Sequence, residues 1–490
     1  MKSGMVYFVG AGPGDIDLIT VKGKQALQEA DVVIFDRLIN PFLLTAVRDD
    51  AKLIYCGKQP CKHTLRQEDI QKEILIHARK GKTVVRLKGG DPAVFGRVGE
   101  EVELLAEHRI AYEIIPGITA GIAATMYSGV PITHRKHSNS FAVVTGHGSK
   151  DDGTPNVEWG PLAKGVETIV FYMGVKHLRT ITTELIKNGK EKDTAALVVQ
   201  WGTYSKQRTV EGSLATIANK VKQANITNPA IIVVGDVAKL RSKLAWFDNK
   251  QLSGRGVLIP SKTEMNQQLV KSLKVNGADV YEHNLLTQVE NIGSEQVNQI
   301  TQLSKEQQLV FLSTQSVYTF LRALGENDLD LRKIESPIYA IDNAVKATLQ
   351  MLGIQSSLAS ICELQSPVLI GGDVEIESMR LEYPKWKEEL VLTKHKVSQK
   401  DIEAFNRLIE EQHVNTLLVT SSKEAIQLVT FLKLSGIEKD SVINTLNVVC
   451  RGIETSLILE AAKIPVKRFR EGENIMTVIR EEETVLAVES

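Results

Sequence analysis

Short runs of β-branched and aromatic residues alternate with helical stretches along the whole chain. In the first part, strands are expected at residues 6–9, 32–35 and 83–87, with a helix up to Ala30 between the first two. Parallel strands need a connection that crosses one face of the sheet, and an alternation of strands with helices provides it. We therefore predict an α/β protein whose first sheet is largely parallel.

A second group of strands is expected further along, beginning at residues 141–144 and continuing at 168–172, 196–199 and 230–234. Each of these runs is short, apolar and rich in β-branched residues, as buried strands of α/β proteins are. We interpret the two groups as two α/β lobes that meet near residues 134–139.

The main domain boundary is expected within residues 241–255, which are polar and charged without clear periodicity and precede a new strand at 256–259. This divides the chain into a first half, residues 1–247, and a second half, residues 252–490. The alternation returns in the second half, where FLSTQSVYTFLRAL and LVTSSKEAIQLVTFL look alike. Each is a strand ending in Ser or Thr followed by a helix, which suggests a duplicated α/β unit.

Charge and cysteine content exclude several classes of protein. The 490 residues include 59 basic and 59 acidic side chains, so no overall field favours nucleic acid or an anionic membrane. The four cysteines are too scattered for a secreted disulfide framework, and the N-terminus lacks a signal-peptide pattern. We expect a cytoplasmic protein with a small-molecule substrate and neither nucleic acid nor membrane as partner.

One uncharged stretch, residues 114–133, is about as long as a bilayer is thick. It contains Pro116, Gly129 and Pro131 together with Thr, Ser and Tyr. These residues favour a buried loop and helix over a membrane span.

The GAGPGD motif at residues 10–15 follows a strand and precedes a helix, as a dinucleotide-binding turn does. The third glycine of that fingerprint would stand at Asp15, and Pro13 lacks the N–H that would bind pyrophosphate. An acidic residue follows about twenty positions on, at Asp31 and Asp36, as the fingerprint requires. A nicotinamide oxidoreductase therefore remains as an alternative that the glycine turn disfavours.

A glycine pair, Gly89 and Gly90, follows the strand at 83–87 and precedes Asp91-Pro92. The carboxyl ends of strands are where open α/β sheets bind ligands, and bare glycine backbone lets a flat ligand approach. Taken alone, the segment is equally well explained as a reverse turn.

A series of motifs occurs in a recognisable order: VGAGPGDIDLIT, ADVVIFDRL, Gly57-Lys58, VVRLKGGDPAVFGR, IIPGITAG, GVPITHR, VTGH, VFYMG and PAIIVVG. Over residues 4–247 the chain resembles the uroporphyrinogen-III C-methyltransferases of the tetrapyrrole methylase family. The resemblance implies two α/β lobes, a homodimer, and S-adenosylmethionine held between the lobes. It also implies conversion of uroporphyrinogen III to precorrin-2, on the way to sirohaem or cobalamin.

The resemblance further assigns residues to roles. Asp36 matches the proposed proton acceptor and Lys58 the proposed proton donor, although Asp36 could instead cap a helix and Lys58 could pair with a substrate carboxylate. The implied cofactor contacts are Pro13, Gly89, Gly90, Asp91, Val94, Thr119, Ala120, Met173 and Gly202. Because the substrate is rich in carboxylates, a basic rim is expected from residues in or beside the motifs. These are Arg37, Arg86, Lys88, Arg97, His134 and Arg135.

No metal site is expected. Cys56, Cys61 and His63 are close in sequence but lack the usual ligand spacing and a fourth ligand. The histidines near the lobe junction, His134, His137 and His147, are expected to make ordinary polar contacts.

The second half resembles, more loosely, the uroporphyrinogen-III synthase family, which cyclises hydroxymethylbilane. The supporting segments are 313–315, 339–344, 420–422 and 452–456. The resemblance implies two interleaved α/β lobes, one formed by residues 252–290 with 397–490 and the other by the segment between them. A bifunctional enzyme would follow, in which the second half makes the substrate of the first.

Three features of the second half depart from the synthase pattern. Asp342 and Val345 stand where the family usually has glycine and threonine, and residues 391–396 lack a common tyrosine. An acid at Asp342 would repel substrate carboxylates. The alternative is therefore a catalytically degenerate domain kept for structure or binding.

Overall fold

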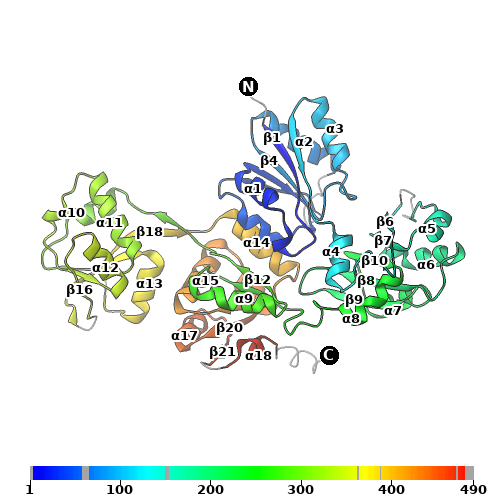
Figure 1. The fold of residues 1–490 in the computed structure, drawn as a ribbon. Coiled ribbons are helices and arrows are strands. Elements are labelled where there is room, and N and C mark those ends of the chain that lie inside the picture. The colour runs from blue at the N-terminus through cyan, green and yellow to red at the C-terminus, as the bar shows by residue number, and fades with distance from the viewer. Residues whose placement is uncertain are drawn as a thin grey trace.

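The computed structural model describes residues 4–57, 66–148, 154–360, 363–386, 388–470 and 473–480. These residues form four β-sheets, two in each half of the chain. In Figure 1 the first sheet, with β1 and β4, lies at the top and the second, with β7 and β8, at the right. The third sheet, with β12 and β20, lies below the first, and the fourth, which includes the long strand β18, lies at the left.

The first sheet is entirely parallel, as predicted. Its order is β3-β2-β4-β1-β5. The strands are β1 (Met5–Gly10), β2 (Val32–Phe35), β3 (Lys52–Tyr55), β4 (Val84–Lys88) and β5 (Ala111–Ile115). Helices α1 (Val21–Glu29), α2 (Gln67–Arg79) and α3 (Val98–Glu107) connect them. Every residue of β2 and β4 is buried, because helices cover both faces of the sheet.

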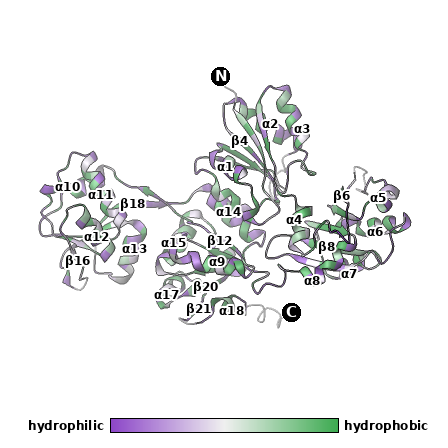
Figure 2. Ribbon diagram, in the orientation of Figure 1, coloured by the Kyte–Doolittle hydropathy of each residue, from purple (hydrophilic) through white to green (hydrophobic). Residues whose placement is uncertain are grey.

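The second sheet is mixed, which the strand pattern did not predict. Its order is β6-β7-β10-β8-β9, with β6 parallel to β7 and the other pairs antiparallel. The strands are β6 (Phe141–Thr145), β7 (Thr168–Tyr172), β8 (Ala195–Gln200), β9 (Arg208–Ser213) and β10 (Ala230–Val234). Helices α5 (Trp159–Gly165), α6 (Leu178–Lys187) and α7 (Ile217–Gln223) pack beside it. Figure 2 shows the apolar strands of both sheets lying inside more polar helices.

The uncharged stretch at residues 114–133 is the end of β5, a turn, and helix α4 (Ala120–Tyr127). Helix α4 joins the two lobes of the first half and packs against the second sheet. None of the helices in the described ranges is long and apolar enough to cross a membrane.

The second half contains two sheets that are interleaved along the chain. The third sheet has the order β12-β11-β19-β20-β21 and is entirely parallel. Its strands are β11 (Gly256–Ile259), β12 (Asp279–Glu282), β19 (Thr416–Val419), β20 (Asn447–Arg451) and β21 (Lys467–Phe469). Its helices are α9 (Gln267–Val275), α14 (Gln399–Glu410), α15 (Ser422–Ser435), α16 (Lys439–Thr445), α17 (Ile453–Ala461) and α18 (Ile475–Arg480).

The fourth sheet is built entirely from the segment between β12 and α14. Its order is β13-β18-β17-β14-β15-β16, and only the β13–β18 pair is antiparallel. The strands are β13 (Thr287–Glu290), β14 (Gln308–Phe311), β15 (Ile338–Ala340), β16 (Ser357–Leu358), β17 (Pro367–Gly372) and β18 (Glu388–Lys396). Its helices are α10 (Ser294–Thr301), α11 (Thr314–Glu326), α12 (Asn343–Met351) and α13 (Asp373–Glu382). Residues 287–290, expected in the other lobe, belong here because β13 pairs with β18.

The two similar segments of the second half have the same local structure. Ser313 follows β14 and caps α11, accepting a hydrogen bond from the N–H of Ser316. Ser421 follows β19 and caps α15 in the same way through Glu424. The hydroxyl satisfies an N–H that the first helical turn leaves unpaired. The repeated strand-Ser-helix unit thus occurs once in each sheet of the second half.

The two halves of the chain share a packed interface. Helix α14 lies against the 3₁₀ segment η2 (Pro41–Ala46) of the first half, and Ala404 is part of the core beneath the first sheet. In the other direction, Ile16 and Phe42 pack against the core of the third sheet. Because apolar residues from both halves are buried together, the first half is not an independent unit on a flexible tether.

Candidate active site

A cavity of about 510 Å³ lies between the two lobes of the first half. It is bordered by the segments that follow the carboxyl ends of β1, β2, β4, β7 and β8, where α/β sheets usually bind ligands. Every residue expected to contact the cofactor lines it: Pro13, Gly89, Gly90, Asp91, Val94, Thr119, Ala120, Met173 and Gly202. Asp36, Arg37 and Lys88 line it as well. The structure thus brings together residues that are far apart in the sequence.

The floor of the cavity is bare backbone where three loops meet. Gly12 and Gly90 exchange two main-chain hydrogen bonds, of 3.2 and 2.8 Å. A Cβ atom on Gly117 would lie only 2.2 Å from the carbonyl oxygen of Gly90, so this approach requires glycine. Asp91 holds the turn through its carboxylate, which accepts from the N–H groups of Ala93 and Gly117 at 2.8 and 3.0 Å.

Tyr172 is a wall residue that sequence reasoning missed, although it stands in the VFYMG motif. Its hydroxyl lies 2.6 Å from the hydroxyl of Thr119 and accepts from the N–H of Gly121, so it joins the second sheet to the start of α4. Burial raises the pKa of Tyr172. Its ring packs against Phe95, whose centroid is 5.1 Å away.

Strained backbone is concentrated around the cavity. Met173, Trp201 and Phe95 line it and have φ values of 56°, 49° and 57°. A side chain in this left-handed region costs roughly 1 kcal/mol, and such residues gather at functional sites. The strain fixes the direction of the chain directly after β7 and β8.

Asp36 lies at the carboxyl end of β2, and its carboxylate accepts a hydrogen bond from the buried guanidinium of Arg86. Asp36 does not cap the following helical segment, because Asn40 does so through the N–H of Phe42 at 3.0 Å. The carboxylate is about one third exposed and faces the cavity, and its contact with Arg86 holds it in place. Lys58, its expected partner in proton transfer, lies outside the described residues.

A buried charge cluster supports the Asp36 side of the cavity. Glu101 on α3 is completely buried and accepts hydrogen bonds from Lys88 at 3.0 and 3.1 Å and from Arg86 at 3.4 Å. Burial and the neighbouring Arg86 lower the pKa of Lys88. Two cations are thus held out of water by the carboxylates of Glu101 and Asp36.

Of the six residues expected to form a basic rim, only Arg37 and Lys88 line the cavity. Arg37 is exposed at the cavity, and Lys88 lines it while paired with Glu101. Arg86 was expected at the rim, but it is 2% exposed and occupied by protein carboxylates, so it supports Asp36 instead. Arg97 pairs with Glu100, and neither Arg97 nor His134 and Arg135 is among the described residues that line the cavity.

The described residues contain no group of metal-ligating side chains. Cys56 is buried, and burial raises the pKa of its thiol to about 11, so it is an unreactive core residue. Cys61 and His63 lie outside the described residues. The rings of His134 and His137 pack together with centroids 4.8 Å apart.

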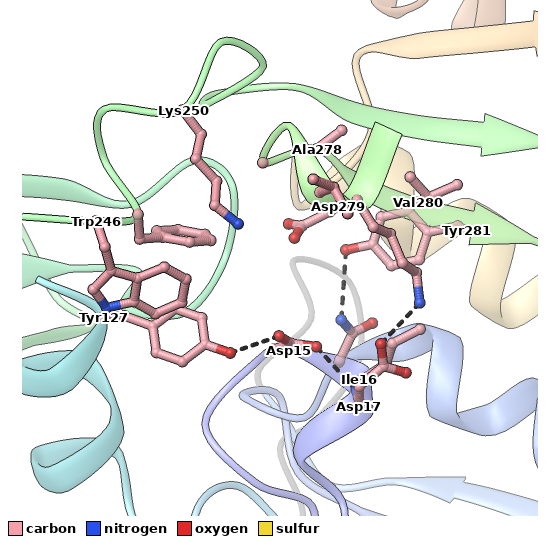
Figure 3. Close-up of a pocket in the computed structure, with 15 residues that line it drawn as sticks. Asp15, Ile16, Asp17, Tyr127, Trp246, Lys250, Ala278, Asp279, Val280 and Tyr281 are labelled. Atoms are coloured by element: carbon pink, nitrogen blue, oxygen red, sulfur yellow. Dashed lines mark hydrogen bonds and ion pairs between the residues drawn. The ribbon is translucent and has the colours of Figure 1, made fainter. Parts of the chain in front are cut away.

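A second pocket, of about 310 Å³, lies where the two halves meet (Figure 3). The Tyr127 hydroxyl donates to Asp15 at 2.8 Å on one side, and Lys274 pairs with Asp17 on the other. Figure 3 shows Lys250 and Asp279 pointing into the pocket from opposite sides. Burial raises the pKa of Asp279 to about 7. One loop thus borders both pockets, since residues 12–13 line the first and 15–17 the second.

A third pocket, of about 380 Å³, lies between the two lobes of the second half. It is bordered by Ser313, Asp342 and Glu375 from the fourth-sheet lobe and by Lys423 from α15 of the other lobe. The Asp342 carboxylate accepts from the N–H of Val345 at 2.8 Å and caps α12. The acid that departs from the synthase pattern therefore has a structural role here.

Comparison with known proteins identifies the family. Residues 5–218 match the family described as Tetrapyrrole (Corrin/Porphyrin) Methylases. A uroporphyrinogen-III C-methyltransferase of Bacillus subtilis (strain 168) is 43% identical over 380 residues, covering 78% of each chain. That of Priestia megaterium is 54% identical over 234 residues, which are 48% of this chain and 98% of the relative. The Bacillus alignment is longer than the first half, so it extends into the second.

Solved structures of similar proteins cover about half of this chain. The native form of the uroporphyrin III C-methyl transferase from Thermus thermophilus is 38% identical, with 48% of this chain and 100% of that chain covered and a TM-score of 0.42. The same values apply to the structure of that enzyme complexed with S-adenyl homocysteine. By its similarity to the Bacillus enzyme over most of both lengths, the chain belongs to the uroporphyrinogen-III C-methyltransferases, within the tetrapyrrole methylase family.

Proposed function

We propose that the first half transfers methyl groups from S-adenosylmethionine to uroporphyrinogen III, giving precorrin-2. The observation that carries this proposal is the gathering of the motif residues, from Pro13 to Gly202, around one cavity of about 510 Å³. Family membership supports the same reaction. A nicotinamide oxidoreductase is disfavoured, because Pro13 and Asp15 interrupt the phosphate-binding turn.

Around the glycine turns and the start of α4, the cavity walls are mainly main chain and small side chains, which allows a compact cofactor to approach closely. Gly12, Gly89 and Gly90 expose main chain, and Thr119 and Ala120 contribute small side chains at the start of α4. Met173 and Gly202 would close the opposite side from the second sheet. When bound, S-adenosylmethionine supplies an electrophilic methyl group. The chain's own contribution to methyl transfer is to hold the reacting atoms close and aligned, which supplies most of the rate in such displacements.

Methylation of a pyrrole carbon is completed by loss of a proton, and Asp36 is the residue that we assign to accept it. Its carboxylate faces the cavity, and Arg86 fixes its orientation from below. Arg37, exposed beside it, is suited to a substrate carboxylate. The assignment of Lys58 as proton donor is a proposal from the motif alone.

The reaction is tested with purified protein, uroporphyrinogen III and S-adenosylmethionine, with products followed by mass. We expect two successive methyl additions. In Asp36→Asn, cofactor affinity should persist while turnover falls by about 100-fold or more, because general-base catalysis is lost. Asp50→Asn, an exposed acid in the same lobe, is the matched control. Unchanged turnover in Asp36→Asn would remove Asp36 from the mechanism.

For the second half we propose a uroporphyrinogen-III synthase-like domain, residues 252–490, that cyclises hydroxymethylbilane. The interleaved lobes and the pocket between them support this proposal, whereas the capping role of Asp342 supports a degenerate domain. Supplying hydroxymethylbilane with S-adenosylmethionine distinguishes the two. Dimethylated type-III product would establish both activities, and type-I ring alone would leave a synthase fold without synthase function. The homodimer implied by the family is tested by light scattering.

A further inference from the structure

The end of helix α14 and the turn after it, residues 407–413, contact the first lobe beside the candidate active site. Arg407 is buried, and its Nη2 donates to the carbonyl oxygen of Arg37 at 2.9 Å. Its guanidinium lies over the ring of Tyr55, 4.8 Å from the centroid, and beside Phe35. Arg37 lines the cavity directly after Asp36. Arg407 therefore holds the main chain at the substrate side of the cavity.

The same turn contacts the second lobe of the first half. The ring of His413 stacks on Tyr204 with centroids 4.5 Å apart and meets Trp201 edge-on at 5.4 Å. Lys206 donates to the carbonyl oxygen of Glu411 at 2.6 Å. Trp201, Gly202 and Tyr204 form the cavity wall after β8. One short segment of the second half thus contacts wall residues from both lobes.

Glu411 connects these two contacts. Its Oε1 accepts from Arg407 Nε and Nη2 at 3.0 and 2.7 Å, and its Oε2 lies 3.2 Å from His413 Nε2. Burial lowers the pKa of His413 to about 4, so the ring that stacks on Tyr204 is neutral at physiological pH. The carboxylate thereby fixes the positions of both side chains.

The residues of this cluster do not satisfy all of their hydrogen-bonding groups, as a contact selected only for stability would. Arg407 Nη1, His413 Nδ1 and the Tyr204 hydroxyl are buried without a hydrogen-bond partner in the described part of the chain. Leaving such atoms unpaired costs about 1–3 kcal/mol each, and apolar side chains would avoid that cost. Polar residues that violate local packing rules in this way are characteristic of functional positions.

We propose that residues 407–413 of the second half position the two walls of the methyltransferase cavity relative to each other. This inference rests on the proposed function of the first half. Arg407 is a positioning residue that acts through Arg37 on the tetrapyrrole side, and His413 is one that acts through Tyr204 on the cofactor side. The second half then contributes to substrate and cofactor binding by the methyltransferase, whether or not it catalyses a reaction of its own.

The test compares variants of the full chain by steady-state kinetics. Arg407→Met should raise KM for uroporphyrinogen III about tenfold, the effect of losing one hydrogen bond to a charged group, and leave KM for S-adenosylmethionine within twofold. His413→Ala should raise KM for S-adenosylmethionine about tenfold and leave KM for uroporphyrinogen III within twofold. Arg407→Lys, which keeps the charge beside Glu411, should restore part of the loss and serves as the measured variant if Arg407→Met does not fold.

Lys400→Met is the matched control, because Lys400 lies on the same helix and bonds to the Val47 carbonyl and to Asp49, away from the cavity. It should lower the melting temperature and change neither KM. Folded Arg407 and His413 variants with both KM values within twofold of wild type would overturn the proposal. If the wild-type chain does not methylate, the proposed function fails. In that case the positioning proposal is tested by measuring the affinity for S-adenosylhomocysteine by calorimetry. An affinity of His413→Ala equal to that of wild type would then overturn the proposal.

Discussion

Replacing Glu101 with Gln is the most direct test of the charge cluster beneath Asp36. The substitution keeps the volume of the side chain but removes the buried carboxylate that Lys88 and Arg86 share. Because both cations are nearly inaccessible to water, water cannot replace the lost charge. Removing one partner of a buried ion pair costs about 3–5 kcal/mol. At about 2–4 °C per kcal/mol for a unit of this size, the melting temperature should fall by roughly 6–20 °C.

The assay is a thermal melt followed by intrinsic fluorescence, with Glu103→Gln as the control. Glu103 lies on the same helix and is exposed, so that variant changes the charge equally without touching the cluster. Its melting temperature should stay within about 2 °C of wild type, as surface substitutions usually do. Equal melting temperatures for the two variants would refute the reasoning, because they would mean that Glu101 does not compensate the buried cations.

Three further predictions concern the glycine floor and the junction between halves. Gly90→Leu should weaken S-adenosylhomocysteine binding at least tenfold in calorimetry, because Gly90 has φ +68° and a side chain there enters the cavity; normal affinity would make the turn purely structural. Gly117→Ala should lower the melting temperature, because its Cβ collides with the Gly90 carbonyl; an unchanged melt would show that the loops can separate. The folded pKa of Asp279, about 7, lies above its ordinary value of 3.8, so its contribution to stability is present at low pH and is lost as pH rises through 7. Asp279→Asn should therefore raise both the melting temperature and, by up to about 4 kcal/mol, the free energy of unfolding at pH 8.5. This gain should shrink as the pH is lowered toward 5, and a gain that does not depend on pH would contradict the prediction.

The residues of the cavity walls were assigned through the family resemblance, which depends on motifs at strand ends, and such motifs are local features of the sequence. Gly89 and Gly90 follow β4 directly, and in a parallel sheet the carboxyl ends of β1, β2 and β4 must meet at one edge. The role of Arg86 could not be predicted in the same way. A cation within a strand is buried when both faces of the sheet are covered, and its partner Glu101 comes from a helix whose position depends on tertiary packing.

The mixed second sheet and the interface between halves were also beyond sequence reasoning. Strand β9 carries Arg208 and Glu211 and has little apolar character, so its antiparallel pairing with β8 depends on its neighbour. Helix α14 has a clear apolar face, and its pattern would fit any apolar surface. That this face reaches η2, with Arg407 beside Arg37, follows only from the folded arrangement.

The interleaving of the second half determines the order in which the chain can fold during synthesis. Strands β11 and β12 leave the ribosome long before β19, their neighbour in the third sheet, whereas the fourth sheet needs only residues 287–396. The insert can therefore fold while its host lobe is incomplete. At about 5–20 residues per second, the roughly 360 residues between Phe42 and α14 take about 20–70 s to synthesise, so the surface around Phe42 that α14 later covers waits that long for its partner. During that interval the apolar residues that η2 buries against α14 are left uncovered in the nascent chain.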